Sequence, residues 1–169
     1  SEPTMVKKLV LLDAIGPLTT PSREAATKYQ LYLKQLKIIK KKPKRLYQTI
    51  EEACLHRGAS GYLSAELVTD IVNRGLKKTD NGFEWRHDPR LLLPSPLKMT
   101  ETQALFFLQE VQAETLLINA TQGFKVDEQR YQKRLDAIAN LQFKTLDCGH
   151  HLHIEQPKEC AKLINAFLS

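Results

Sequence analysis

The chain has 169 residues and an ordinary globular composition, with 42% hydrophobic and 26% charged residues, so one domain with a sizeable core is expected. No apolar run is long enough to span a bilayer and no secretory signal opens the sequence, which argues against a membrane protein. Cys54, Cys148 and Cys160 share no C-x-x-C spacing. We interpret them as free thiols, and a reducing, cytoplasmic setting is expected.

The formal net charge is +6, and much of it comes from one basic run, Lys40 to Arg45. Such a run could bind nucleic acid or another anionic surface. However, no aromatic residue is interleaved with these lysines, and lysines also favour the C-terminal end of a helix. We therefore interpret the run as a solvated helix end and linker, and nucleic acid is not an expected partner.

The first half of the chain is predicted to begin with a strand and to continue as helices. Residues 6–14 contain a continuous apolar block, Leu9 to Leu12, which is typical of a strand buried on both faces of a parallel sheet. Gly16-Pro17 ends this strand. Helices are then expected from Ser22, as N-cap, to Pro43, from about Lys44 to His56, and from Ser64, as N-cap, to Gly75.

The second half contains clearer local signals. Asn81-Gly82 between two short runs predicts a hairpin, and Thr100 with Gln103 resembles a capping box at a helix start. That helix is expected to bury Ala104, Phe107, Leu108 and Val111. A second buried strand is predicted at 114–120 and a third strand at 141–147, with a helix at 127–138 between them and a last helix from Pro157 to Leu168.

This order of elements predicts an α/β fold. From residue 100 onward the chain alternates helix, strand, helix, strand and helix, which implies parallel strands. Residues 18–99 are interpreted as a mainly helical cap, inserted into a core made of residues 1–17 and 100–169. Ligands of α/β proteins bind at the carboxyl ends of parallel strands. The turn that ends the third strand, Asp147 to His150, is therefore the expected position of a site.

Several segments resemble the C-terminal portion of the α/β-hydrolase fold. RLDAIANLQFKTLDCGHHLHIEQPKECAKLINAFL resembles that family's closing strand, catalytic-histidine loop and last helix. GFEWRHDPRLLLPSP and TLLINATQG resemble the end of its cap and its penultimate strand, and MVKKLVLLDAIGP resembles the strand that enters the cap. The sequence of these segments most resembles the serine hydrolase-like subgroup. The resemblance implies a partial α/β-hydrolase fold, with three parallel strands, flanking helices, a mainly helical cap and no cofactor.

By this resemblance, His150 is the general base, a role that suits a side chain with a pKa near neutrality. His151 and His153 are weaker candidates, and a purely structural role for His150 is the alternative. No metal site is expected. Only His151 and His153 could share a strand face, and no further His or Cys cluster completes a zinc site.

The acid partner is left between two aspartates. The family usually places an aspartate after the penultimate strand, where Gly123 stands in this chain. Asp13 ends the strand that enters the cap, a position that some family branches use, and it is preferred to Asp127. Both have structural alternatives. Asp13 could tether the cap loop through backbone N–H groups, and Asp127 could be a helix N-cap.

The nucleophile elbow of the fold, G-x-S-x-G, is absent. The required flanking glycines are missing at every serine: Ser1, Ser22, Ser60, Ser64, Ser95 and Ser169. A histidine base without an activated hydroxyl has nothing to deprotonate, so this polypeptide alone is not expected to hydrolyse esters. Cys148 is too near His150 on the same turn to present its sulfur to that imidazole.

The strand at residues 6–13 is also expected to have an unpaired edge, because its neighbour in the family sheet is missing. An exposed apolar edge invites association. We expect the missing N-terminal half of the protein, or a second copy in a homo-oligomer, to cover it.

Two functions follow as hypotheses. The first is the cap and C-terminal lobe of a serine hydrolase or esterase that acts on small, largely apolar esters. Trp85, Phe106 and Phe107 would then be candidate substrate-binding wall residues, although large aromatic side chains usually bury for packing. The second is a non-catalytic, truncated hydrolase-like module that acts through protein–protein association.

Overall fold

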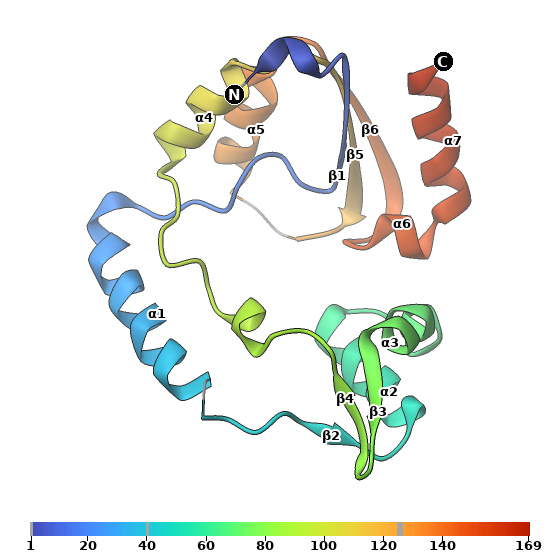
Figure 1. Ribbon diagram of the computed structural model, residues 1–169. Coiled ribbons are helices and arrows are strands. Elements are labelled where there is room, and N and C mark those ends of the chain that lie inside the picture. The colour runs from blue at the N-terminus through green and yellow to red at the C-terminus, as the bar shows by residue number, and fades with distance from the viewer. Residues whose placement is uncertain (1, 40, 125–126) are drawn as a thin grey trace. The chain divides into compact units, whose positions relative to one another are not determined.

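The computed structural model describes residues 2–39, 41–124 and 127–169 (Figure 1). The chain divides into two compact units: residues 1–22 with 98–169, here called the core unit, and residues 23–97, here called the cap unit. Each unit has its own three-stranded sheet and its own hydrophobic core.

The sheet of the core unit is parallel. Its strands are β1 (Lys8–Leu12), β5 (Glu114–Gln122) and β6 (Leu141–Gly149), in the spatial order β1-β5-β6. Lys8 aligns with Glu114, and Thr115 aligns with Leu141. The predicted trio of neighbouring parallel strands is confirmed.

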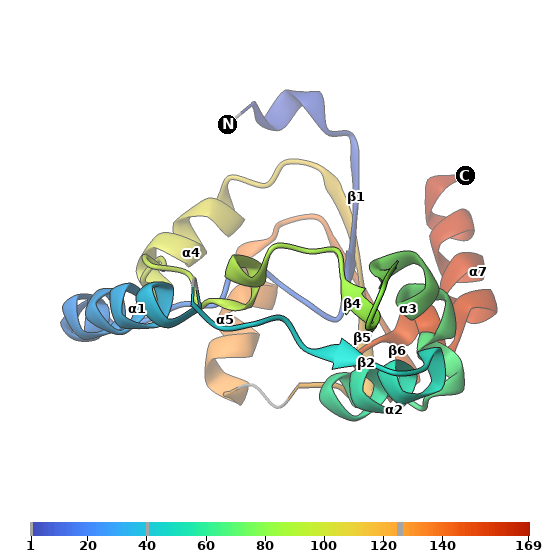
Figure 2. The same ribbon diagram turned by 60° about the horizontal axis from the view of Figure 1, so that its bottom comes forward.

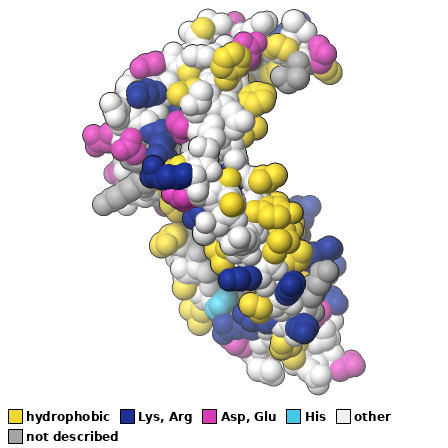
Figure 3. Space-filling view, turned by 90° about the vertical axis from the view of Figure 1, so that its left-hand side faces the viewer, with side chains coloured by type: hydrophobic (Ala, Val, Ile, Leu, Met, Phe, Trp, Pro, Cys, Tyr) yellow, Lys and Arg dark blue, Asp and Glu magenta, His cyan; other side chains and the backbone are white. Residues whose placement is uncertain are grey.

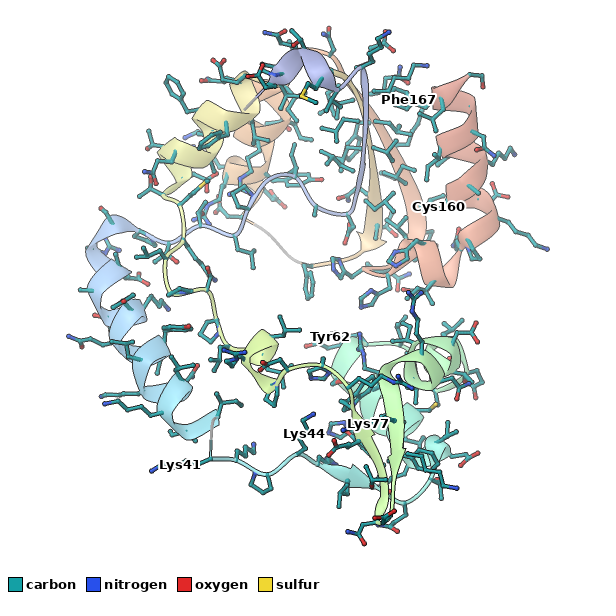
Figure 4. All side chains as sticks on the ribbon, in the orientation of Figure 1. Lys41, Lys44, Tyr62, Lys77, Cys160 and Phe167 are labelled. Carbon is teal, nitrogen blue, oxygen red and sulfur yellow. The ribbon has the colours of Figure 1, made fainter. Side chains whose placement is uncertain are left out.

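Helices cover both faces of this sheet, as Figure 1 shows. On one face Leu116 and Ile118 of β5 pack in the same cluster as Cys160 and Phe167, which project from α7 (Pro157–Leu168) toward the sheet (Figure 4). The other face is covered by α4 (Glu101–Gln109) and α5 (Glu128–Ala137), and its cluster comprises Ile15, Leu108, Leu117 and Ile138. The alternation along β5 explains its continuous apolar sequence, because both faces are buried.

The start of α4 confirms the predicted capping box. Thr100 Oγ1 accepts from the Gln103 backbone N–H at 3.3 Å, and Gln103 Oε1 accepts from the Thr100 N–H at 2.9 Å. Ala104 and Leu108, one turn apart, are buried as expected. The predicted burial of Phe107 is wrong, since 55% of its surface is exposed. The nine-residue helix buries only a narrow stripe, and Phe107 lies beside that stripe.

The cap unit contains a small antiparallel sheet and several helices. Its strands β2 (Leu46–Tyr47), β4 (Gly82–Trp85) and β3 (Leu76–Thr79) lie in that spatial order, and β2 runs beside β4 in Figure 2. The hairpin at Asn81-Gly82 is confirmed. The remaining elements are the 3-10 turns at Ser22–Glu24, Glu66–Val68 and Pro89–Leu92 and the helices α1 (Ala25–Ile39), α2 (Ile50–Gly61) and α3 (Thr69–Gly75).

Two helix predictions in the cap unit are wrong at their starts, and the first of these helices also ends later than predicted, at Gly61 instead of His56. Residues 46–47 form a strand rather than a helix, because Tyr47 pairs with Phe83 and is 1% exposed. Thr49 then caps α2, its side chain accepting from the Glu52 N–H at 3.1 Å. Ser64 is not the N-cap of a single helix, since a 3-10 turn capped at Ala65 precedes α3.

The ends of the first predicted helix also differ. A 3-10 turn occupies Ser22–Glu24 before α1 begins at Ala25. The helix is assigned to Ile39, and Lys40 lies outside the described residues. No helix in the described part of the chain is both long and apolar enough to cross a bilayer.

Candidate active site

The carboxyl-terminal edge of the parallel sheet brings Asp13 and His150 together. Asp13 follows β1 directly and His150 follows β6 directly. Because the strands are parallel, their ends meet at one edge of the sheet. His150 Nδ1 lies 2.6 Å from Asp13 Oδ2. The aspartate side chain is 4% exposed and the imidazole 29% exposed, so the carboxylate is buried beneath a histidine that reaches solvent.

The backbone fixes the Asp13 carboxylate. Its Oδ1 accepts from the Ala120 N–H at 2.7 Å, and the Asp13 N–H donates to the Ile118 carbonyl at 2.8 Å. Asp13 adopts a left-handed conformation with φ of 49°, which aspartate tolerates better than most residues. The turn at the end of β1 thus holds the side chain against β5, with one oxygen on the backbone and the other on the imidazole.

Gly123 explains why the carboxylate can sit there. A Cβ atom at position 123 would overlap the Asp13 carboxylate. In the family that the sequence resembles, this position usually carries the acid. Here it is a glycine, and the carboxylate of Asp13, which follows β1, fills the space beside it.

Asp127 is not brought to His150. It is exposed and caps α5, with its Oδ1 accepting from the Arg130 N–H at 2.8 Å. Of the two candidate acids, the structure pairs only Asp13 with the histidine.

The turn that carries His150 is held on both sides. Glu155 Oε2 accepts from the Gly149 N–H at 2.9 Å, and Gln156 Nε2 donates to the Asp147 carbonyl at 2.7 Å. These residues lie at the end of α6 (Leu152–Glu155) and just after it. A Cβ at position 149 would come within 2.7 Å of Glu155 Oε1. A larger residue before the histidine would therefore have to displace the Glu155 carboxylate, which holds the Gly149 N–H.

Sequence reasoning missed Phe124. Its ring centroid lies 4.2 Å from that of His150, so the phenyl ring packs against the imidazole. The available signal was its place in the loop directly after β5, beside Gly123. Phe124 is 61% exposed and therefore covers the histidine without being part of the core.

The neighbouring histidines and cysteine contribute differently. His151 occupies the N-cap position of α6 and His153 lies within that helix, so the two do not share a strand face. No group of three potential metal ligands occurs among the described residues. Burial raises the pKa of the Cys148 thiol, which disfavours the nucleophilic thiolate.

The three candidate wall aromatics belong to different units of the chain. Trp85 lies in β4 of the cap unit, whereas Phe106 and Phe107 lie on α4 of the core unit. Phe106 and Phe107 are 68% and 55% exposed. Neither is a core residue.

The geometry has a defined chemical capacity. If Nδ1 carries a hydrogen and donates a hydrogen bond to Asp13, Nε2 of the same ring has a lone pair. That nitrogen can then accept a proton from a substrate or nucleophile. The carboxylate keeps the ring in that orientation and stabilises the imidazolium that forms. Such a pair performs general-base catalysis when a hydroxyl comes within hydrogen-bond reach of Nε2.

Comparisons with known proteins place this geometry in context. No family model matches the sequence. The chain is similar to a serine hydrolase-like protein of Dictyostelium discoideum, with 25% identity over 99% of this chain and 50% of the relative. It is also similar to a serine hydrolase-like protein of Danio rerio, with 27% identity over 98% of this chain and 54% of the relative. The chain thus spans about half the length of both relatives.

Solved structures agree with these relatives. A hypothetical protein from Pseudomonas aeruginosa PAO1 superposes with a TM-score of 0.89 and 31% identity, over 99% of this chain and 60% of that one. The thioesterase domain from the curacin biosynthetic pathway superposes with a TM-score of 0.73 and 19% identity, over 97% of this chain and 57% of that one. The chain therefore has the α/β-hydrolase fold, over a part that corresponds to about half of a serine hydrolase-like protein.

Proposed function

We propose that this chain supplies the histidine and the acid of a serine hydrolase, and that the attacking serine lies outside these 169 residues. The observation that supports it best is the 2.6 Å contact between His150 Nδ1 and a buried Asp13 at the carboxyl ends of parallel strands. The names of the curated relatives agree with this class of reaction. The chain has no G-x-S-x-G motif of its own, so by itself it is inactive toward esters.

In the proposed mechanism, His150 Nε2 takes the proton of the serine hydroxyl as its oxygen attacks the ester carbonyl. The C–O bond to the alcohol breaks, and the imidazolium returns its proton to that alcohol as it leaves. Water then attacks the acyl-enzyme, again through His150, and the acid product is released. Asp13 stays ionised throughout and offsets the positive charge on the ring.

The proposed substrates are small, largely apolar esters. The three free cysteines fit the reducing, cytoplasmic setting that we propose for the protein.

The unpaired edge of β1 supports the proposal that a further segment pairs with this strand. Among the described residues, β1 pairs only with β5, and its other edge has no strand beside it. Leu9 to Leu12 are only half-buried, whereas Leu116 to Ile118 of β5 are at most 2% exposed. We propose that a segment with the nucleophile pairs with this edge. A second copy of the chain is the alternative, and it corresponds to a module that acts by association rather than catalysis.

A fluorophosphonate probe tests the proposal, because it labels only activated serines. The chain would be probed alone, and then joined to the segment that precedes Ser1 in its gene if that segment contains G-x-S-x-G. No labelling is expected for the isolated chain, and labelling of a serine in the added segment is expected for the joined protein.

Two outcomes would contradict this assignment. Labelling of the isolated chain would mean that the nucleophile lies within it. A joined protein that carries the motif, folds and still resists the probe would favour the association module. Sedimentation of the isolated chain then measures its oligomeric state. A dimer would agree with a second copy that covers the β1 edge.

A further inference from the structure

A cavity of about 670 Å³ opens within the cap unit, and the hydrolase proposal gives it no role. Its walls come from the end of α1, the linker before β2, α2, β4 and the turn at Pro89–Leu92. No residue that lines it takes part in the contacts of His150 or Asp13. This volume lies within the range of small-molecule sites.

The wall of the cavity is cationic. No Asp or Glu of the described residues lines it. Four Lys or Arg side chains do: Lys42, Lys44, Arg45 and Arg57. Glutamates outside the wall pair with two of these cations, Lys44 with Glu84 at 3.7 Å and Arg45 with Glu52 at 3.9 Å. The other two have no ion-pair partner among the described residues. Figure 4 shows Lys44 beside the strands of the cap unit.

The rest of the wall is aromatic and apolar. Tyr47 is 1% exposed, and its hydroxyl accepts from Trp85 Nε1–H at 3.3 Å. The same hydroxyl lies 3.1 Å from His56 Nδ1, to which it can donate its own hydrogen. The imidazole then carries its proton on Nε2, which makes it a further donor. Figure 3 shows Lys and Arg side chains beside hydrophobic ones on the surface of the cap unit.

We propose that this cavity binds an organic phosphate, meaning a phosphate or pyrophosphate group joined to a ring or an acyl chain. Two unpaired cations, Lys42 and Arg57, match a multiply charged anion better than a single carboxylate. Trp85 and Leu92 give the ring or chain an apolar wall. A concave site of this volume encloses a molecule of nucleotide size, whereas a nucleic-acid duplex needs an extended basic surface.

Trp85 makes the test direct, because it is the only tryptophan of the chain and it lines the cavity. Its fluorescence would be followed in the 169-residue chain during titration with pyrophosphate, ADP and adenosine at low salt, with calorimetry as the second measurement. ADP is expected to bind more tightly than pyrophosphate, and adenosine without a phosphate is expected not to bind. Added salt should weaken the binding.

The variants Lys42→Gln and Arg57→Gln should each weaken ADP binding about tenfold or more, since a hydrogen bond to a charged group is lost. Lys34→Gln and Lys78→Gln are the matched controls. They remove the same charge from the same unit but lie outside the cavity, and they should change the affinity less than about twofold, since only distant screened charge is lost.

Three results would overturn the proposal. The first is a chain that has a native circular dichroism spectrum but shows neither a change in Trp85 fluorescence nor a heat of binding. The second is equal weakening by the control variants, which would show unspecific attraction to a basic surface. The third is tight binding of an oligonucleotide that ADP does not displace, which would assign the basic residues to nucleic acid.

Discussion

The two units contain histidines held in contrasting ways. In the core unit, His150 contacts a carboxylate contributed by a residue 137 positions away. In the cap unit, His56 contacts the hydroxyl of Tyr47, only nine positions away. A carboxylate stabilises an imidazolium during proton transfer, whereas a phenol hydroxyl only orients a neutral ring. The difference agrees with the two proposals, proton transfer in the core unit and ligand binding in the cap unit.

The sheets explain this contrast. The parallel strands β1 and β5 are separated by about a hundred residues of sequence, and their pairing gathers distant side chains at one edge. The cap sheet is built from a hairpin and one short strand that lie within residues 46–85.

The sharpest test of the contrast is activity in the protein joined to its nucleophile segment. His150→Gln is expected to reduce the rate of fluorophosphonate labelling by about 10⁴-fold, and Asp13→Asn by about 10²- to 10⁴-fold, because the base is lost in one and loses its orienting charge in the other. His153→Gln is the control, since His153 is exposed on α6 and has no contact with Asp13. Equal activity of the Asp13→Asn protein would mean that another acid serves His150.

A second test compares two arginine–carboxylate pairs. In the core unit, Arg134 is 8% exposed and donates to both oxygens of Glu101, at 2.7 and 2.8 Å, and to the Ile15 carbonyl at 2.7 Å. Arg134→Met should therefore destabilise the core unit by about 3 kcal/mol. Hydrogen exchange measured by mass spectrometry reports each unit separately.

The matching pair in the cap unit is Arg90 with Asp88, which is local and exposed. Arg90→Met should leave the exchange of the cap unit unchanged, because surface ion pairs contribute little. A comparable loss of exchange protection in both variants would show that burial does not determine how much an arginine–carboxylate pair stabilises its unit.

The third test concerns the cap hairpin. Gly82 has φ of 128°, and a Cβ there would overlap the Tyr47 carbonyl of β2. Gly82→Ala should cost about 2 kcal/mol or more, because backbone strain adds to the clash. The loss of exchange protection should be confined to residues 46–85. Asp80→Ala in the same turn is the control, and an unaltered hairpin in the Gly82→Ala protein would contradict the assigned conformation.

The smallest expected effect is on acid stability. The Arg134 hydrogen bonds hold the pKa of Glu101 below its ordinary value. A carboxyl with a lowered pKa in the folded state contributes its full stability above its unfolded pKa and loses it as pH falls through the folded pKa. The core unit should thus lose stability progressively at acidic pH, and Glu101→Gln should flatten that dependence.

Asp88 provides the comparison in the cap unit. Arg90 lowers the pKa of Asp88 to about 2, but both groups are exposed. At moderate salt, Asp88→Asn should leave the acid unfolding of the cap unit unchanged. Parallel acid profiles for the Glu101→Gln and wild-type proteins would count against a role for the Arg134 pair.

Several parts of the fold were predictable from the sequence because their causes are local. The Asn81-Gly82 turn and the Thr100 capping box each depend on a few adjacent residues. The apolar runs at Leu9 to Leu12 and in β5 predicted parallel strands, which is confirmed. The predicted burial holds for Leu116 to Ile118 of β5, whereas Leu9 to Leu12 are only half-buried because one edge of β1 is unpaired among the described residues. By contrast, the sequence predicts a helix start where β2 lies, because only pairing with Phe83 makes an extended Tyr47 favourable. The exposure of Phe107 likewise depends on what packs beside α4.

The candidate site divides in the same way. The sequence alone determined that a Gly-His turn follows a strand and that Asp13 directly follows another, because residue order fixes which side chains follow which strands. It was the family resemblance that made Asp13 and Asp127 the candidate acids. Only the tertiary structure shows which of them lies beside the histidine, since strand pairing brings Asp13 within 2.6 Å of His150 and Asp127 is a helix cap. The same holds for the cap cavity, where the basic run meets Tyr47 and Trp85 only after the chain folds. Contacts between residues far apart in sequence carry no local signature, and both sites consist of such contacts.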